Sequence, residues 1–147
     1  MQQQQQILNE ARSWIGTPYR HQTSEKGAGC DCLGLLRGVW RDLFGEEPAR
    51  IPAYTPDWSE PSRDEVLWRA ACAYLVVKPL TQAAPGDVLL FRMRRGAVAK
   101  HLGIQAACGA APTFIHAYSG HAVTESPLSQ PWVRRIAARF EFPKESN

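Results

Sequence analysis

The hydrophobic period of this chain changes from helical to strand-like near Pro85-Gly86, and no other feature constrains its fold as strongly. Before this point, apolar residues recur at helical spacing. The clearest run has them at i, i+3, i+4, i+7, i+8 and i+11, which are Cys32, Leu35, Leu36, Val39, Trp40 and Leu43. After it, short alternating segments are separated by turn residues. This order predicts an α+β domain in which N-terminal helices pack on a central antiparallel sheet.

Local signals place three helices and five strands along the chain. Asp31 is a good N-cap for the second helix, and Gly34 and Gly38 inside it indicate the close approach of another backbone. Ser62 and Glu65 form a capping box that predicts the start of the third helix. The helices are expected over residues 7–15, 32–43 and 62–74, and the strands over 87–93, 100–107, 113–118, 122–125 and 135–142.

The composition fits one globular domain of 147 residues, with 44% hydrophobic and 21% charged residues. A formal net charge of +3 is too small to indicate nucleic-acid binding, and no apolar run reaches the ~18 residues that membrane insertion requires. The glutamine-rich N-terminus lacks the basic and apolar segments of a secretory signal. We therefore expect synthesis in the cytoplasm and free thiols at all four cysteines.

Cys32 is the first candidate for chemistry, because it is expected in the first turn of a helix. Unpaired N–H groups and the positive end of the helix dipole favour a thiolate there and can lower a thiol pKa to ~3.5–7.5. Such a sulfur would be alkylated by iodoacetamide faster than Cys108 near neutral pH. The same spacing also fits a small core residue packed beside Leu35 and Leu36.

His101 and His116 are expected on neighbouring strands, where they could serve as a base and the group that orients it. A hairpin turn centred between Cys108 and Gly109 would place them directly opposite each other. A register shift of two would make a diagonal pair on one face, and a shift of one would separate them. A chance pairing of two half-buried histidines fits the same spacing.

A zinc site is a competing use of these side chains, since Cys30, Cys32, His101 and His116 could supply four ligands. The Cys-x-Cys spacing is not that of the usual zinc knuckle, and no second cysteine pair follows. We therefore expect neither a metal ion nor another cofactor.

Five short motifs occur in order along the chain. They are Gly16-Thr17-Pro18-Tyr19, Asp31-Cys32-Leu33-Gly34-Leu35, Pro85-Gly86-Asp87-Val88, His101-Leu102-Gly103-Ile104 and Phe114-Ile115-His116-Ala117. From about residue 7 to residue 140, the chain resembles the NlpC/P60 family of papain-like cell-wall cysteine peptidases. The sequence Gly29-Cys30-Asp31-Cys32 most resembles the phage-tail and gene-transfer-agent branch. The resemblance implies a papain-like fold and a single catalytic domain over residues 1–147.

The resemblance also implies a catalytic set. Cys32 resembles the nucleophile, and His101 resembles the general base that later protonates the leaving amine. His116 resembles the polar third member that orients His101. Metal ions and cofactors have no part in this chemistry.

Two further positions resemble substrate-binding residues of the family. Tyr19 resembles a tyrosine whose hydroxyl faces the nucleophile. Asp31 lies where related enzymes recognise a substrate amine, although its N-cap role explains the residue equally well. Leu33 departs from the family pattern, because many relatives carry serine after the cysteine.

The function implied by the resemblance is hydrolysis of amide bonds in peptidoglycan stem peptides, commonly between D-glutamate and diaminopimelate. The absence of a signal and of a wall-binding module suggests delivery by a phage-like tail or baseplate, with action in the periplasm or cell wall. The alternative is a non-catalytic tail adaptor or wall-binding module on the same fold, which would dock through residues 49–68.

Overall fold

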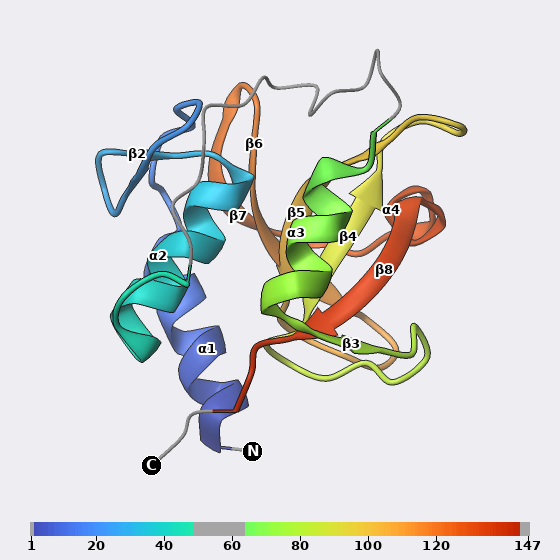
Figure 1. The fold of residues 1–147 in the computed structure, drawn as a ribbon, viewed down its shortest axis with the longest axis horizontal. Coiled ribbons are helices and arrows are strands. Elements are labelled where there is room, and N and C mark those ends of the chain that lie inside the picture. The colour runs from blue at the N-terminus through green and yellow to red at the C-terminus, as the bar shows by residue number, and fades with distance from the viewer. Residues whose placement is uncertain (1, 49–63, 145–147) are drawn as a thin grey trace.

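A six-stranded antiparallel sheet with the strand order β3-β8-β4-β5-β6-β7 forms the centre of the computed structural model, which describes residues 2–48 and 64–144 (Figure 1). The helices are α1 (Gln2–Arg12), α2 (Cys32–Phe44), α3 (Val66–Tyr74) and α4 (Gln130–Arg135). The sheet contains β3 (Val76–Lys78), β4 (Val88–Arg92), β5 (Ala99–Gln105), β6 (Thr113–Tyr118), β7 (His121–Pro127) and β8 (Ile136–Glu141), and β1 (Ser24–Glu25) pairs separately with β2 (Gly29–Cys30).

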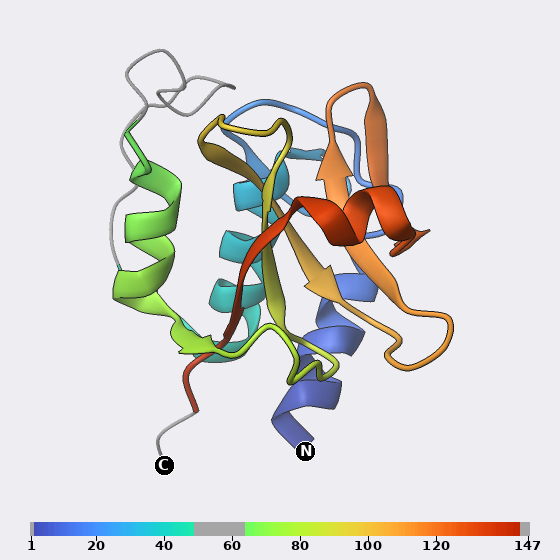
Figure 2. The same cartoon turned by 90° about the vertical axis from the view of Figure 1, so that its right-hand side faces the viewer.

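The two faces of the sheet are covered by different helices, with α1 and α2 to the left of the strands in Figure 1 and α4 to the right. Turned by 90°, Figure 2 shows α4 in front of the strands and α2 behind them. Alternate strand residues therefore enter two cores. On the α2 side these are Val88, Leu90, Leu102, Ile104 and Ile115, with Leu67 and Ala71 of α3 in the same cluster. On the α4 side they are Leu89, Phe91 and Phe114, with Leu128 and Trp132.

The second helix begins and ends where the sequence predicts. Asp31 is its N-cap, and its carboxylate accepts a hydrogen bond from the Gly34 N–H at 2.7 Å. The predicted close approach of a backbone is confirmed at Gly34, where an added Cβ would lie 1.8 Å from the Thr23 carbonyl oxygen. At Gly38 the neighbour is instead the ring of Trp14.

The third helix does not begin at residue 62, as the sequence predicts. It begins at Val66 with Glu65 at the N-cap position, and Ser62 lies outside the described residues. The Glu65 carboxylate accepts hydrogen bonds from the Ala99 N–H and from Arg92. Glu65 therefore ties α3 to the β4–β5 hairpin, which is a tertiary contact that a local capping pattern does not reveal.

The short elements were not predicted. Helix α4 occupies residues expected to be a loop and the start of the last strand, and β1, β2 and β3 contain only two or three residues each. Such elements are too short to show a hydrophobic period, because one turn of helix or one pair of strand residues gives no repeat. Within the described ranges, no helix is long and apolar enough to cross a membrane.

The Pro85-Gly86-Asp87-Val88 motif has a structural role at the end of the sheet remote from α2's first turn. Asp87 is buried and pairs with the equally buried Arg139 at 2.8 Å and with Lys78 at 2.9 Å. These charges come from β8 and β3, so the carboxylate joins three neighbouring strands. A buried carboxylate needs such partners, since an unpaired buried charge is strongly unfavourable.

Candidate active site

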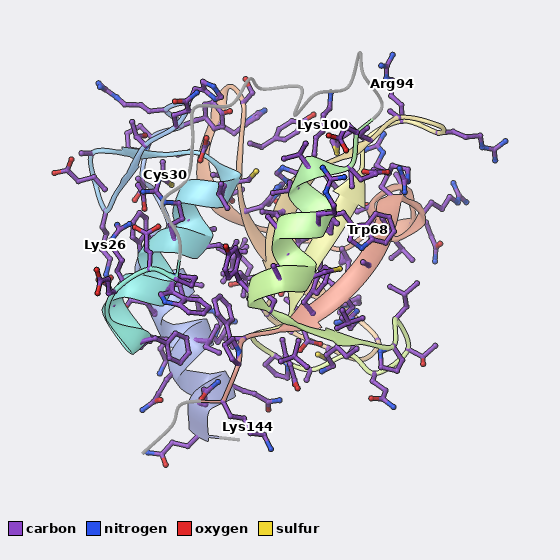
Figure 3. All side chains as sticks on the ribbon, viewed as in Figure 1. Lys26, Cys30, Trp68, Arg94, Lys100 and Lys144 are labelled. Carbon is purple, nitrogen blue, oxygen red and sulfur yellow. The ribbon has the colours of Figure 1, made fainter. Side chains whose placement is uncertain are left out.

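The sulfur of Cys32 lies at the first residue of α2 and faces the main chain of β5. The side chain is 8% exposed, and Sγ lies 4.0 Å from the carbonyl oxygen of Lys100. The N–H groups of Leu102 and Leu33 also hydrogen-bond to the sulfur. The sulfur is therefore held against the main chain on both sides of His101. Figure 3 shows Lys100 at the same upper end of the molecule as the start of α2.

A separation of two strands makes room for this sulfur. Strands β5 and β6 pair at Ile104↔Ile115 and Gln105↔Phe114, although β5 begins five residues earlier, at Ala99. In a strand, the carbonyl of one residue and the N–H two residues later point to the same edge. The Lys100 carbonyl and the Leu102 N–H share such an edge, and they meet the sulfur there.

The two imidazoles form a hydrogen-bonded pair on the α4 face of the sheet. His101 Nε2 and His116 Nδ1 are 2.9 Å apart, and the two residues are 5% and 3% exposed. Counted on from Ile104↔Ile115, the last pair of the ladder, the register places His116 across from Gly103 rather than from His101. The diagonal arrangement, one of three considered from the sequence, is therefore the one present.

Gly103 makes this diagonal contact possible. A Cβ at this position would lie 2.7 Å from Cδ2 of Phe114, whose ring stacks on His116 with centroids 4.1 Å apart. The absence of a side chain leaves room for the Phe114 ring, which in turn packs on His116. Gly103 thus admits the aromatic ring of a neighbouring strand.

Aromatic side chains surround both imidazoles. Phe91, Tyr118 and Trp132 have ring centroids 5.6, 5.5 and 5.7 Å from that of His101. Burial, together with the charge that His116 would carry, lowers the pKa of His101 to about 3. Burial also lowers the pKa of His116 to about 4. Both rings are therefore neutral at physiological pH, as a general base must be before it accepts a proton.

The prediction that the pKa of the Cys32 thiol is lowered was wrong. Burial, reinforced by the negative charge of Asp31, raises the pKa of Cys32 to about 12. The N–H groups of Leu102 and Leu33 act in the opposite direction, but their effect is smaller than that of desolvation. At rest, the site therefore holds a thiol and a neutral imidazole.

A buried sulfur at a helix start thus lies against the main chain on both sides of His101, and the His101 ring is hydrogen-bonded to His116. The chain with this geometry also matches a family model over most of its length. The NlpC/P60 family model matches residues 16–140. This protein belongs to the NlpC/P60 family. No curated protein matches the chain.

Several solved structures resemble this NlpC/P60 protein. A protein described as similar to a lipoprotein of the NLP/P60 family, from Staphylococcus aureus, is 19% identical with a TM-score of 0.65, and an NlpC/P60 family protein from Bacillus cereus is 18% identical with a TM-score of 0.66. The NlpC/p60 domain of the peptidoglycan hydrolase SagA is 23% identical with a TM-score of 0.58. The three alignments cover 99%, 95% and 96% of this chain, and 42%, 40% and 98% of those chains.

These similarities establish the fold of the NlpC/P60 chain. The predicted α+β, papain-like architecture, with helices on a central antiparallel sheet, is confirmed. This chain spans less than half the length of the Staphylococcus and Bacillus proteins, and nearly the whole of the SagA domain.

Tyr19 lies close enough to Cys32 for a negative charge on the sulfur to change the pKa of its phenol. Its main chain runs parallel to β2 in a bridge with Cys30, two residues before Cys32. Burial, and next the charge that Cys32 would carry, raise the pKa of Tyr19 to about 12. The phenol therefore keeps its proton near the sulfur and is available as a hydrogen-bond donor.

Both carboxylate oxygens of Asp31 accept hydrogen bonds from main-chain N–H groups. Oδ1 accepts from Gly34 and Oδ2 from Gln22, each at 2.7 Å. Nδ1 of His21 lies 3.7 Å from Oδ2. The predicted N-cap role is confirmed, and any substrate amine would have to share these oxygens with the protein's own donors.

The zinc alternative finds no support in the part of the chain that the structure describes. Among residues 2–48 and 64–144, no three His, Cys, Asp or Glu side chains are grouped so that they could hold a metal ion. Cys30 is fully buried, and His116 directs its Nδ1 to His101.

Sequence analysis missed one residue of the site, Ser126, and placed another, Trp132, in a loop that could line a groove or simply pack. Ser126 Oγ lies 3.0 Å from His116 Nε2, and the Trp132 ring lies against both imidazoles. Alternation along residues 122–125 could have placed Ser126 on the histidine face once the strand was extended by one residue. No comparable signal exists for Trp132, because the six-residue helix that carries it has no readable period.

The buried, protonated sulfur leads to a prediction about its reactivity. We expect iodoacetamide to alkylate Cys32 more slowly than the exposed Cys72 and Cys108 at about pH 7, which reverses the expectation from the sequence. The Cys32 rate should rise about tenfold per pH unit up to about pH 10, because the thiolate fraction grows in that proportion below the pKa. Timed labelling of the folded protein, read by peptide mass spectrometry, measures each rate.

One outcome would contradict the raised pKa. If the Cys32 rate is constant between about pH 5 and pH 8, the sulfur is already a thiolate paired with an imidazolium. The exposed Cys72 supplies the internal reference for reagent reactivity at each pH.

Proposed function

We propose that this protein is a cysteine peptidase or amidase that hydrolyses amide bonds in peptidoglycan stem peptides. The observation that carries the proposal is the position of the Cys32 sulfur against the main chain beside His101, whose imidazole is bonded to His116 at 2.9 Å. In this proposal Cys32 is the nucleophile, His101 is the general base and His116 orients it. A core cysteine would need neither a neighbouring base nor a second imidazole behind that base.

The ring nitrogens of His101 have different tasks in the proposed reaction. Nε2 is bonded to His116, so Nδ1 is left for the thiol. Nδ1 is also the nitrogen nearer the main chain, and the Cys32 sulfur lies against the main chain at Lys100 and Leu102. The proton of the thiol therefore passes to Nδ1 as the sulfur attacks.

The first half of the reaction forms a thioester. Sγ bonds to the carbonyl carbon, and the electron pair of the C=O double bond moves to oxygen, where N–H groups at the start of α2 that are not bonded to Asp31 stabilise the negative charge. When this intermediate collapses, the C–N bond breaks and the leaving amine takes the proton from His101 Nδ1. Help of this kind from a general acid and base contributes about 10²–10⁴-fold.

Hydrolysis of the thioester completes the cycle. His101 removes a proton from water as the water oxygen attacks the thioester carbon, and the C–S bond then breaks. The sulfur recovers the proton from His101 and the carboxylic acid product leaves. Because thiol and imidazole are both neutral at rest, charge separates only while substrate is being attacked.

The substrate class is supported by the family and by one similar structure. The SagA domain, of nearly the same extent as this chain, belongs to a protein described as a peptidoglycan hydrolase. Within that class, we propose cleavage between D-glutamate and a diamino acid such as diaminopimelate, with Tyr19 and Asp31 as substrate contacts. The raised pKa of Tyr19 supports a role as hydrogen-bond donor.

The biological setting is also part of the proposal. The resemblance of Gly29-Cys30-Asp31-Cys32 to the phage-tail and gene-transfer-agent branch suggests a single catalytic domain, made in the cytoplasm and carried by a tail or baseplate into the periplasm and cell wall. A non-catalytic tail adaptor or wall-binding module is the second candidate. The buried thiol, with its raised pKa, is the observation that favours it.

Defined muropeptides test this function directly. We expect the protein to split a stem peptide into two fragments whose masses sum to that of the substrate plus one water, with cleavage after D-glutamate. Mass spectrometry of timed digests identifies the bond. Binding of peptidoglycan without any released fragment would overturn the peptidase proposal and support the adaptor.

A further inference from the structure

The hydrogen-bond chain of the site continues beyond His101 and His116. His116 uses Nδ1 for His101, and its other ring nitrogen, Nε2, lies 3.0 Å from Oγ of Ser126 on β7. The ladder of β6 and β7 pairs Phe114 with Ser126 and His116 with Thr124. Ser126 therefore lies diagonally from His116, on the same face of the sheet.

The protonation pattern of the two rings depends on this contact. For His101 to accept the thiol proton at Nδ1, its ring must carry hydrogen on Nε2, which then donates to Nδ1 of His116. His116 must in turn carry hydrogen on Nε2 and donate it to Ser126 Oγ. In the opposite pattern, His101 carries hydrogen on Nδ1 and has no lone pair for the thiol proton.

We propose that Ser126 is a positioning residue that accepts the Nε2–H of His116 and thereby keeps His101 in the tautomer that can act as a base. The inference rests on the proposed function, because tautomer choice at His101 matters only if this ring takes a proton. Ser126 acts through His116 and does not itself touch the reacting atoms.

The two rings packed most closely on His116 cannot perform this task. Phe114 stacks on the ring at 4.1 Å, and Trp132 meets it edge-on with centroids 5.2 Å apart. Aromatic rings fix the plane of an imidazole, but they offer its N–H no lone pair comparable to that of a hydroxyl oxygen. Thr124 lies directly across from His116, yet the hydroxyl that reaches Nε2 is that of Ser126.

The contact also matters during the reaction. When His101 takes the proton, its positive charge polarises the bond to His116 and makes the Nε2–H of His116 a stronger donor. A hydroxyl oxygen at 3.0 Å can respond by strengthening its hydrogen bond. Ser126 thus stabilises the imidazolium that forms on attack more than the neutral ring that precedes it.

Three variants test the proposal. Ser126→Ala should lower kcat about threefold to tenfold with little change in KM, as expected for the loss of one neutral hydrogen bond used in the transition state. Ser126→Thr keeps the hydroxyl and should restore most of kcat. Thr124→Ala removes the neighbouring hydroxyl of the same strand and face, and should leave kcat unchanged.

A second readout does not depend on turnover. Two-bond ¹H–¹⁵N spectra of histidine-labelled protein report which ring nitrogen carries hydrogen. We expect both His101 and His116 to carry it on Nε2 in the wild type and in Thr124→Ala, and Ser126→Ala to shift both rings toward the Nδ1–H form. Tautomers that are unchanged in Ser126→Ala, or an equal loss of kcat in Thr124→Ala, would overturn the proposal.

The two readouts separate the possible failures. If the wild type releases no fragments from muropeptides, the proposed function fails, and the positioning role fails with it even where the tautomers shift. If the wild type cleaves normally but Ser126→Ala leaves tautomers and kcat unchanged, the peptidase proposal stands and the role of Ser126 alone is rejected.

Discussion

Cys32→Ala is expected to abolish release of stem-peptide fragments, lowering turnover by at least about 10⁴-fold. Without Sγ no thioester forms, and the remaining groups can only position the substrate and polarise its carbonyl. The fold should survive, since the change removes one buried sulfur and the resulting small cavity costs roughly 1 kcal/mol. Mass spectrometry of muropeptide digests measures the turnover, and thermal unfolding measures the stability.

The other cysteines of the chain supply matched controls for this variant. Cys72 and Cys108 are exposed free thiols, so alanine at either position removes the same atom without touching the site. Both variants should retain wild-type turnover. Turnover that persists in Cys32→Ala, or that falls equally in Cys72→Ala, would refute Cys32 as the nucleophile.

The same variant also separates the peptidase from the adaptor. A peptidase that loses its nucleophile still binds its substrate, so Cys32→Ala should co-sediment with peptidoglycan while the wild type clears the suspension. Co-sedimentation of both proteins, without clearing by either, is the behaviour expected of an adaptor or wall-binding module.

Much of the candidate site could be predicted because strand alternation is a local property. His101 and His116 lie at positions that share a face in two of the three registers considered, and their observed diagonal contact is one of those two. In the observed register Gly103 lies against the Phe114 ring, where a side chain would collide with it. That contact joins residues of different strands, so neither segment alone reveals it.

The electrostatics of the site could not be predicted in the same way. A position at a helix start favours a thiolate, yet desolvation by the surrounding fold dominates and raises the pKa of Cys32. Helix α4 brings Trp132 against both imidazoles, and that six-residue helix leaves no periodic trace in the sequence. Burial is a tertiary property, so local signals gave the correct position of Cys32 and the wrong direction for its pKa.

The fold follows a similar division. The long second helix, with its unbroken spacing from Cys32 to Leu43, was predicted almost to the residue. The predicted start of the third helix, at residue 62, was wrong, because the helix begins at Val66. Glu65, just before it, binds Arg92 and the Ala99 N–H instead of completing a local capping box. Long elements can be predicted from their hydrophobic period, whereas the bounds of elements that are fixed by contacts with distant residues cannot.

Gly38→Ala is expected to lower the free energy of unfolding by about 3 kcal/mol, although alanine is the better helix former by about 1 kcal/mol. A Cβ at this position would lie 1.9 Å from Cζ2 of Trp14 and 2.3 Å from Cη2. The ring has little freedom to move, because it is 1% exposed and its Nε1 donates to Glu10 at 3.1 Å. The segment that carries Trp14, just after α1, would therefore be forced away from α2. Urea unfolding, followed by circular dichroism, measures the loss.

A double-mutant cycle assigns this loss to the Trp14 ring. In a Trp14→Leu background the benzo ring that fills the space beside Gly38 is absent. Gly38→Ala should then become neutral, or stabilising by up to about 1 kcal/mol, through helix propensity. The difference between the two backgrounds should reach about 3–4 kcal/mol, which is well above the ~0.5 kcal/mol expected of independent sites. Equal effects of Gly38→Ala in both backgrounds would show that the close packing of Trp14 on α2 does not limit the stability of this domain.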